Sequence, residues 1–391
     1  MNYSSTIFNQ LLNFLPKHKF KQLVAEHDTD KHIRKLTTWN QFVALLYAQA
    51  TGKDSLREIE TGLSVHNNIW YHLGVGSVAR SSLADANAKR DHQVYERLFY
   101  ALMERCHEVT PHRKFKFKNP LYSFDASIVN LCLSVFDWAK YRTTKGALKL
   151  HVLLDNRTAI PEIINITEGK VADIVMFKKI SMDRLEKGSI IVFDRAYIDY
   201  EWWKKMNENE LFFVSRTKIN QNIFIIGQHK AALERNVLAD DIVMLGSYDV
   251  ISKEKYTDRL RQIKYWDEEN RKQLVFLTNN FNLTAGQIAG IYKDRWQIEL
   301  FFKWIKQNLK IKAFLGTSKN AVLTQIWIAM IYYLLLSYIK FQTKFKKSLL
   351  ELTRMIREAL LFRRDLIDLL SLEEKTVFRL KPEENPQMSF W

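Results

Sequence analysis

Three carboxylates in this sequence, Asp125, Asp194 and Glu299, could together carry out metal-dependent chemistry. Asp125 interrupts the apolar stretch LYSFDASIV, and Asp194 directly follows the wholly apolar stretch SIIVF. Two acids on neighbouring strands repel each other unless cations lie between them, and hard carboxylate oxygens suit Mg²⁺ or Mn²⁺. Each aspartate alone is more simply explained as a turn or cap residue at the end of a strand. Together with a third acid on a helix, the pair predicts a divalent-metal site.

The third acid, Glu299, lies in a segment that is rich in positive charge. The segment YKDRWQIELFFKWIKQNLK has no proline or glycine and carries five cations against two carboxylates, so we expect a helix over residues 292–310. At 100° per residue, six side chains fall in one narrow stripe: Tyr292, Arg295, Glu299, Lys303, Lys306 and Lys310. A surface helix with a salt-bridged polar face is the simpler interpretation, and the rest of the chain has to overturn it.

The elements that would position these acids follow Pro120. We expect a strand over LYSFDASIVNL, a hairpin of GALKLHVLLD and AIPEIINITE across Asn156 and Arg157, and a helix over about 172–187. The strand SIIVF ending at Asp194, a helix opening at Asp199 and the strand LFFVSR complete the order β-β-β-α-β-α-β. Followed by two helices, this order predicts a ribonuclease H-like fold, an α/β mixed sheet with flanking helices. Asp194 would then lie at the carboxyl edge of the sheet, where open α/β sheets keep their sites.

The remaining segments predict five parts along the chain. Residues 1–118 are predicted to be an all-helical domain that is compatible with DNA binding. Residues 119–216 and 282–343 would form the two parts of the sheet-and-helix core, with the Glu299 helix beginning near Thr284. Between them, IVMLGSYDVIS, RLRQIKYW and QLVFLTNN predict a β-rich insertion over residues 217–281. Residues 344–391 are predicted to be a helical tail that binds a partner subunit or closes the domain.

Charge indicates a polyanionic partner. The 391 residues include 59 Lys and Arg against 43 Asp and Glu, a net charge of +16, which favours nucleic acid before a membrane. The two cysteines, Cys106 and Cys132, exclude a disulfide scaffold or a cysteine-based zinc site and suit a reducing cytoplasm. The sequence HLGVGSVA has the glycine spacing of a dinucleotide loop, but no strand precedes it, so we reject a cofactor site there.

One segment has the length and composition of a membrane span. Residues 320–339 contain no charge over about the length that crosses a bilayer. The segment also holds Thr324, Gln325 and Ser337, so we expect a buried core helix packed under the sheet. The N-terminus lacks a basic leader followed by an apolar run, and no signal peptide is expected.

A family resemblance connects these residues. The spacing Tyr292-(2)-Arg295-(3)-Glu299-(6)-Lys306 matches the signature of DDE transposases from one large family of bacterial insertion sequences. FDAS around Asp125 and VFDRAYIDY around Asp194 resemble the two aspartate motifs of that family, and FFVSRTK with Arg216 resembles its next strand. The resemblance extends from about residue 119 to 340.

The resemblance implies a chemistry and a partner. Asp125, Asp194 and Glu299 would hold two divalent ions, Mg²⁺ or Mn²⁺, which activate a water or a DNA 3′-hydroxyl and stabilise the leaving oxygen. DNA phosphates would be held by the surrounding polar side chains: Tyr292, Arg295, Lys303, Lys306 and Arg216. Glu299 is then a metal ligand in a helix whose cations bind the strand being cut.

The predicted function is a transposase that binds terminal inverted repeats, cleaves the element ends and joins the 3′ ends to target DNA. Its partners would be double-stranded transposon ends and target DNA, with a homodimer in the complex, in the cytoplasm and on the nucleoid, without a membrane. Two alternatives are a ribonuclease H-like nuclease without strand transfer and a domesticated DNA-binding regulator without catalysis. The presence of all three acids disfavours the regulator.

Hairpin formation during excision stays open. Better-known relatives hold a flipped base against an aromatic residue near the insertion. At the matching strand this sequence has Leu274, and Trp266 lies nearby.

Overall fold

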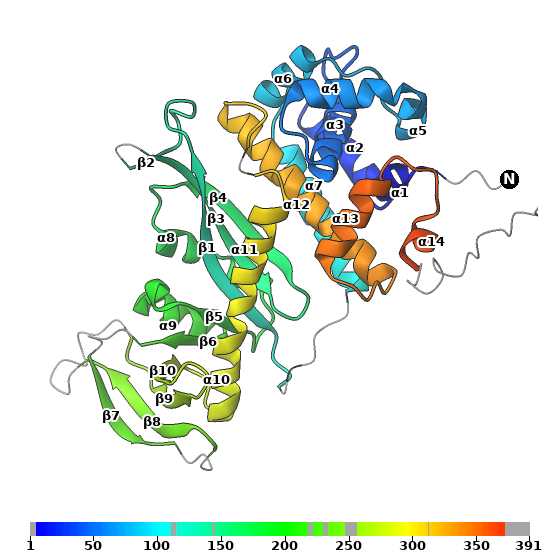
Figure 1. Cartoon of the computed structure of the whole chain (residues 1–391). Coiled ribbons are helices and arrows are strands. Elements are labelled where there is room, and N and C mark those ends of the chain that lie inside the picture. The colour runs from blue at the N-terminus through cyan, green and yellow to red at the C-terminus, as the bar shows by residue number, and fades with distance from the viewer. Residues whose placement is uncertain are drawn as a thin grey trace, which may run out of the picture. The chain divides into compact units, whose positions relative to one another are not determined.

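The computed structural model describes residues 5–110, 115, 117–142, 145–217, 222–229, 234–246, 256–311 and 313–371. The chain forms two compact units, the first made of residues 1–110 and 327–391 and the second of residues 111–326 (Figure 1). The first unit is helical in its described residues, and the second is built on a large sheet. The expected combination of an α/β mixed sheet, flanking helices and an N-terminal helical region is confirmed.

Within the described residues, the sheet of the second unit has ten strands. They are β1 (Leu121–Leu131), β2 (Lys140–Arg142), β3 (Lys145–Asp155), β4 (Ile160–Glu168), β5 (Ile190–Phe193), β6 (Phe212–Arg216), β7 (Ile223–Gln228), β8 (Val237–Leu245), β9 (Leu260–Asp267) and β10 (Lys272–Thr278). Their order is β2-β3-β1-β5-β6-β10-β9-β8-β7, and β4 also pairs with β3. β5 is parallel to β1 and to β6, whereas β3 is antiparallel to β1 and β4. The strands β4, β3, β1, β5 and β6 thus form the predicted ribonuclease H-like sheet.

The β-rich insertion extends this sheet rather than forming a separate one. β10 pairs with β6, so strands β7 to β10 continue the ladder outward. β7 was not expected from the sequence, and neither was the short β2. The first residues of the expected strand IVMLGSYDVIS form the end of β8, and its residues 247–252 lie outside the described residues.

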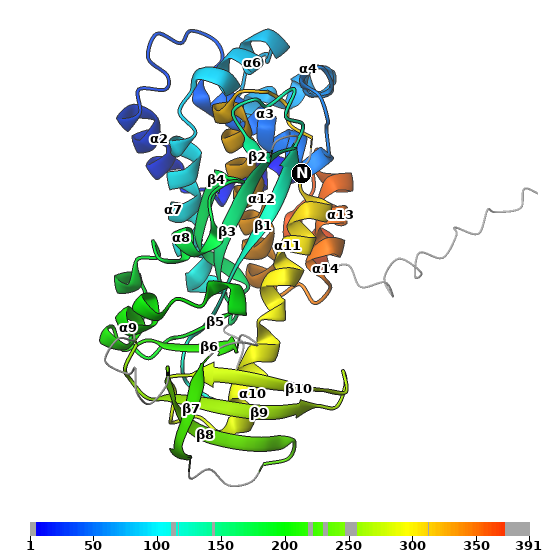
Figure 2. The same ribbon diagram turned by 90° about the vertical axis from the view of Figure 1, so that its left-hand side faces the viewer.

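Helices cover both faces of the sheet (Figure 2). On one face, α8 (Asp173–Phe177) and α9 (Tyr200–Glu208) pack over a core that includes Phe124, Phe193 and Trp202. On the other face, α10 (Ala285–Asp294) covers a core that includes Val192 and Phe276, and α11 (Trp296–Asn308) packs against β1.

Two helix predictions in this unit are wrong in extent. The helix expected over 172–187 is only α8 and a 3₁₀ turn, η2 (Met182–Arg184). Ile180 and Leu185 both reach the core from irregular backbone, so tertiary packing overrides local helix propensity here. The single helix expected over 292–310 is two helices divided at Arg295, whose backbone stays near helical values at φ −53° and ψ −29°.

Local sequence signals account for several element boundaries. Thr284 and Gln287 form a capping box that starts α10, and Asp199 accepts a hydrogen bond from the backbone N–H of Trp202 at the start of α9. Both starts agree with the sequence prediction. β5, Ile-Ile-Val-Phe, is buried at every position, as expected for a central strand covered on both faces.

The first unit contains helices from both ends of the chain. They are α1 (Ile7–Asn13), α2 (Lys17–Glu26), α3 (Thr38–Thr51), α4 (Leu56–Val65), α5 (Trp70–Leu73), α6 (Arg80–Lys89), α7 (Gln93–Val109), α13 (Leu349–Ala359) and α14 (Leu366–Ser371), with part of α12 (Lys319–Gln342) and the short 3₁₀ turn η1 (Asn67–Ile69). α13 packs against α3, and Arg357 donates a hydrogen bond to the carbonyl of Ala50 at 3.3 Å.

The uncharged helix α12 is buried, as predicted. In length and composition it is the one helix among the described residues that could cross a membrane, but 94% of its most apolar window is buried, as in a core helix. The expected position under the sheet is wrong for residues from Trp327 onward, which belong to the helical unit. Trp327 packs against Phe99 at 5.4 Å between ring centroids, and Leu334 accepts a hydrogen bond from Cys106.

Candidate active site

The two aspartates lie on adjacent strands where those strands stop pairing. β1 and β5 run parallel, and their last paired residues are Phe124 and Phe193. Asp125 and Asp194 are the next residues along the two strands, so they stand side by side where this pairing ends. Asp194 stands at the carboxyl end of β5, where the sequence places it.

Arg216 lies at the same edge of the sheet. β5 and β6 are parallel, and their register pairs Val192 with Val214. Continued by two residues along each strand direction, this register brings Asp194 level with Arg216, the last residue of β6. Asp125, Asp194 and Arg216 therefore follow one another across three adjacent strands.

Glu299 reaches this edge from α11, next to the arginine that links the acids. Arg295, at the junction of α10 and α11, has its Nη1 at 3.8 Å from Oδ2 of Asp125. Its Nη2 donates a hydrogen bond to Oε1 of Glu299. One guanidinium thus spans two of the three predicted metal ligands, and it is only 16% exposed.

The hydroxyl of Tyr292 is subject to the charges of Arg295, Asp194 and Arg216. Burial raises the pKa of its hydroxyl; Arg295 and Arg216 act to lower that pKa, and Asp194 acts to raise it. The Tyr292 ring packs against Phe276 at 5.0 Å and stands 5.8 Å from the Arg295 guanidinium. The structure therefore places Tyr292 beside Arg295, which contacts Asp125 and Glu299, while Asp194 and Arg216 lie level with each other at the ends of β5 and β6.

Asp125 is the most constrained of the three carboxylates. Burial raises its pKa, while the backbone N–H of Ala126, the hydroxyl of Tyr197 and the charge of Arg295 act to lower it, and Glu299 raises it again. A buried carboxylate that is costly to ionise favours cations nearby. In the structure Arg295 supplies that positive charge.

Lys303 and Lys306 lie further along α11, about one and two turns beyond Glu299. Lys303 is exposed and Lys306 is half-buried. Both lysines therefore lie on the predicted polar stripe of α11, further along the helix than Glu299.

Comparison with known proteins places the chain in a family. Residues 116–335 match the family model described as transposase DDE domain, and residues 3–76 match a domain of unknown function. A protein described as a transposase in Sinorhizobium fredii (strain NBRC 101917 / NGR234) is 32% identical over 319 residues, covering 80% of this chain and 86% of the relative. The chain belongs to the DDE transposases of insertion sequences.

Two further relatives of this transposase carry similar descriptions. One, described as a transposase for an insertion sequence element of Geobacillus stearothermophilus, is 28% identical and covers 65% of each chain. Another, described in the same way in Synechocystis sp. (strain ATCC 27184 / PCC 6803 / Kazusa), is 24% identical over 71% of this chain and 76% of its own length. The family predicted from the tyrosine, arginine, glutamate and lysine spacing is therefore confirmed.

The donor set of the transposase fits a hard divalent cation. Oδ1 of Asp125, Oδ1 of Asp194 and Oε1 of Glu299 accept the hydrogen bonds recorded for these acids. Among the hydrogen bonds of the described residues, the second oxygen of each acid has no donor, which leaves three carboxylate oxygens for Mg²⁺ or Mn²⁺. The described residues contain no ready-made cluster of three or more ligands, and Arg295 lies between Asp125 and Glu299.

One residue at the site was missed from the sequence. The hydroxyl of Tyr197 donates a hydrogen bond to Oδ1 of Asp125 at 3.0 Å. The available signal is its position three residues after Asp194, within the motif VFDRAYIDY.

The two insertion residues considered for base stacking differ in exposure. Leu274 on β10 is buried, whereas Trp266 on β9 is 40% exposed. The buried leucine has no free face for a base.

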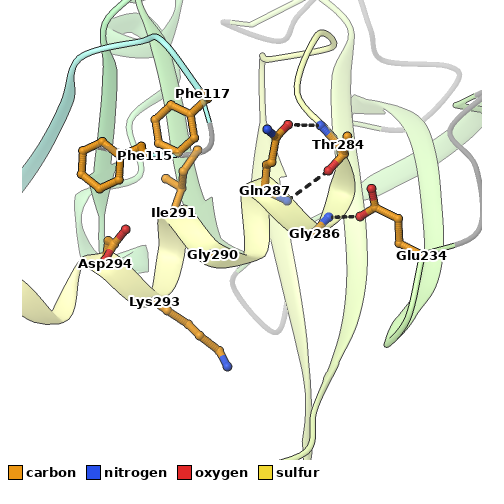
Figure 3. Close-up of a pocket in the computed structure, with 10 residues that line it drawn as sticks. All are labelled: Phe115, Phe117, Glu234, Thr284, Gly286, Gln287, Gly290, Ile291, Lys293 and Asp294. Atoms are coloured by element: carbon orange, nitrogen blue, oxygen red, sulfur yellow. Dashed lines mark hydrogen bonds between the residues drawn. The ribbon is translucent and has the colours of Figure 1, made fainter. Parts of the chain in front are cut away.

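A cavity of about 650 Å³ lies along α10 and does not include the three acids (Figure 3). Phe115 and Phe117 stack on one side of it with 5.1 Å between ring centroids. Gly286 lies on the helix at the other side, where its backbone N–H donates to Glu234. The lining of the cavity mixes apolar, acidic and basic groups and matches no single class of ligand.

Proposed function

We propose that this transposase binds the terminal inverted repeats of its element, cleaves the ends by two-metal phosphodiester hydrolysis and joins the 3′ ends to target DNA. The observation that carries the proposal is the contact of Arg295 with both Asp125 and Glu299, beside Asp194 in the neighbouring strand. Arg295 thus links two acids from distant parts of the chain, at the edge of the sheet where Asp194 also stands. In an ordinary structural ion pair, an arginine needs only one acid as its partner, whereas Arg295 contacts two.

The three acids would hold Mg²⁺ or Mn²⁺, two ions per active site. When bound, the ions would lower the pKa of the attacking water or 3′-hydroxyl and stabilise negative charge on the attacking and leaving oxygens. Cations around the acids, Arg295 and Lys306 above all, would hold the phosphates of the strand being cut, and arginine can do so with two hydrogen bonds. Arg216, Lys303 and the hydroxyl of Tyr292 would add contacts to the same backbone.

The parts of the chain would divide this work. Residues 1–118 would bind the element end, and residues 119–216 with 282–343 would form the catalytic core. Residues 217–281 would be an insertion that lines the DNA path. The tail, 344–391, would pack against the helical part, as α13 does against α3.

Cleavage of a labelled duplex tests the proposal. The duplex carries the element's own end repeat, and wild type is compared with Glu299→Gln, Asp125→Asn and Asp194→Asn in Mg²⁺ or Mn²⁺. We expect nicking at the repeat boundary in wild type, loss of nicking in each variant, and end binding within about twofold of wild type in every variant. Glu208→Gln, at an exposed acid on α9, serves as the control and should cut normally.

The outcomes separate the proposal from its alternatives. Tight binding without cutting in wild type, under either metal, would favour a DNA-binding regulator. Cutting without joining of 3′ ends to target would favour a nuclease. Loss of binding in step with cleavage in the acid variants would remove their role as metal ligands.

We further propose that a homodimer holds the paired ends in the cytoplasm, because two ends need two active sites. Light scattering of the complex with both ends should give two protein chains. A monomer holding both ends would contradict this.

A further inference from the structure

A single 3₁₀ turn, η3 (Arg195–Tyr197), connects the two aspartates of the site. Asp194 caps the turn, because its Oδ1 accepts a hydrogen bond from the backbone N–H of Ala196 at 3.2 Å. One residue later, Tyr197 donates its hydroxyl to Oδ1 of Asp125 at 3.0 Å. The same short segment therefore contacts both carboxylates through hydrogen bonds.

Packing fixes the position of the Tyr197 hydroxyl. The residue is 3% exposed. Its ring meets Phe124 edge-on at 5.1 Å and Phe177 at 5.4 Å between centroids. Because Phe124 directly precedes Asp125, the tyrosine ring is anchored on the strand that carries its acceptor.

This contact leaves Asp125 with two different oxygens. Oδ1 accepts from the N–H of Ala126 at 2.8 Å and from the hydroxyl of Tyr197. Oδ2 accepts no hydrogen bond in the described part of the chain and faces Nη1 of Arg295 at 3.8 Å. With one oxygen held by two donors, rotation of the carboxylate is opposed and Oδ2 stays directed toward the Arg295 and Glu299 side.

We propose that Tyr197 is a positioning residue of the cleavage reaction: its hydroxyl holds Asp125 so that Oδ2 is presented to the divalent ion. The η3 turn then sets the two aspartates as one unit, since the segment that Asp194 caps also carries the donor for Asp125. This inference rests on the proposed metal-dependent cleavage. Groups that orient a metal ligand through a hydrogen bond typically contribute 10- to 100-fold in metal affinity or activity.

Tyr197→Phe tests the role, because phenylalanine keeps the buried ring and removes only the donor. Mn²⁺ binding to the full-length protein with its end duplex is measured by titration calorimetry, together with the Mn²⁺ concentration that gives half-maximal nicking. We expect both to shift about 10-fold or more to higher Mn²⁺. End-duplex affinity without metal should be unchanged, and nicking should recover at saturating Mn²⁺.

Tyr122→Phe is the matched control. Tyr122 is a buried tyrosine on the same strand β1, and its hydroxyl contacts Nη2 of Arg157 at 3.3 Å instead of a site acid. The Mn²⁺ dependence of this variant should equal that of wild type, and urea unfolding of both variants shows whether either loses its fold.

Three results would overturn the inference. Wild-type Mn²⁺ dependence in Tyr197→Phe would do so while leaving metal-dependent cleavage intact. An equal shift in Tyr122→Phe would show a general packing effect. Absence of both Mn²⁺ binding and nicking in the wild type would overturn this inference and the proposed function together.

Discussion

Arg295 contacts two carboxylates at once, Asp125 through Nη1 and Glu299 through Nη2. Burial acts to lower the pKa of its guanidinium, but Tyr292, Glu299 and Asp125 outweigh burial and raise that pKa. The arginine therefore stays charged and separates two acids that would otherwise repel each other. A divalent cation would compete with it for Oδ2 of Asp125.

At the residue scale, Arg295→Ala should destabilise the metal-free protein. The variant leaves Asp125 and Glu299 without their shared cation, and we expect the free energy of unfolding in EDTA to fall by about 2 kcal/mol, moderated by the partial exposure of both acids. Lys303→Ala, at an exposed position on the same helix, should change it by less than about 0.5 kcal/mol. Urea titration of both variants measures the difference, and equal stability would argue against the bridging role.

At the element scale, strand β3 carries a buried histidine, His151, that contacts polar side chains of neighbouring elements. His151 is fully buried, with Nε2 at 2.9 Å from Oγ1 of Thr167 and Nδ1 at 3.7 Å from Asp173. Burial lowers the pKa of its imidazole to about 4, Lys149 adds to that effect, and Asp173 opposes it. The histidine is therefore neutral in the folded protein at neutral pH.

This strand should make the fold sensitive to acid. An unfolded histidine takes up a proton near pH 6.5, whereas folded His151 resists protonation down to about pH 4. Its contribution is therefore fully present above about pH 6.5 and is lost as the pH falls toward 4, by about 2 kcal/mol at pH 5. In His151→Gln, the loss of unfolding free energy between pH 7 and pH 5 should be smaller than in wild type by about that amount. Urea unfolding at the two pH values decides, and an equal loss would contradict the assignment.

At the scale of the whole molecule, positive charge is unevenly distributed. Residues 282–326 hold seven Lys or Arg against two Asp or Glu, whereas residues 1–110 hold thirteen against eleven. The 45 residues around Glu299 therefore carry five of the sixteen net positive charges, a higher density than in residues 1–110. A concentrated positive field attracts DNA phosphates and makes affinity depend on salt.

The salt dependence of DNA binding tests this distribution. Lys303→Ala should reduce the slope of log affinity against log salt by about one, as expected for the loss of one phosphate contact. Lys187→Ala is the control, because Lys187 pairs with Glu210 at 2.6 Å on an exposed surface. Fluorescence anisotropy with the end duplex at several salt concentrations gives both slopes. A slope unchanged by Lys303→Ala would take this lysine out of the DNA path.

The sequence by itself determined which segments around Asp125 and Asp194 form strands, where the helix after the insertion begins, at Thr284, and the family. These features depend on local patterns: apolar runs of strand length, a capping box, and acids and cations at fixed spacing. Such patterns act over a few residues, so they can be recognised without knowing what packs against them.

Only the tertiary structure decided the contacts between distant segments. Arg295 meets Asp125, which lies 170 positions earlier, and Tyr197 meets the same acid from a different strand end. The pairing of β10 with β6, the division of the predicted 292–310 helix at Arg295 and the place of α12 among the helices are of the same kind. Each depends on which buried surfaces pack together most favourably across the whole chain, and local periodicity carries no information about that choice.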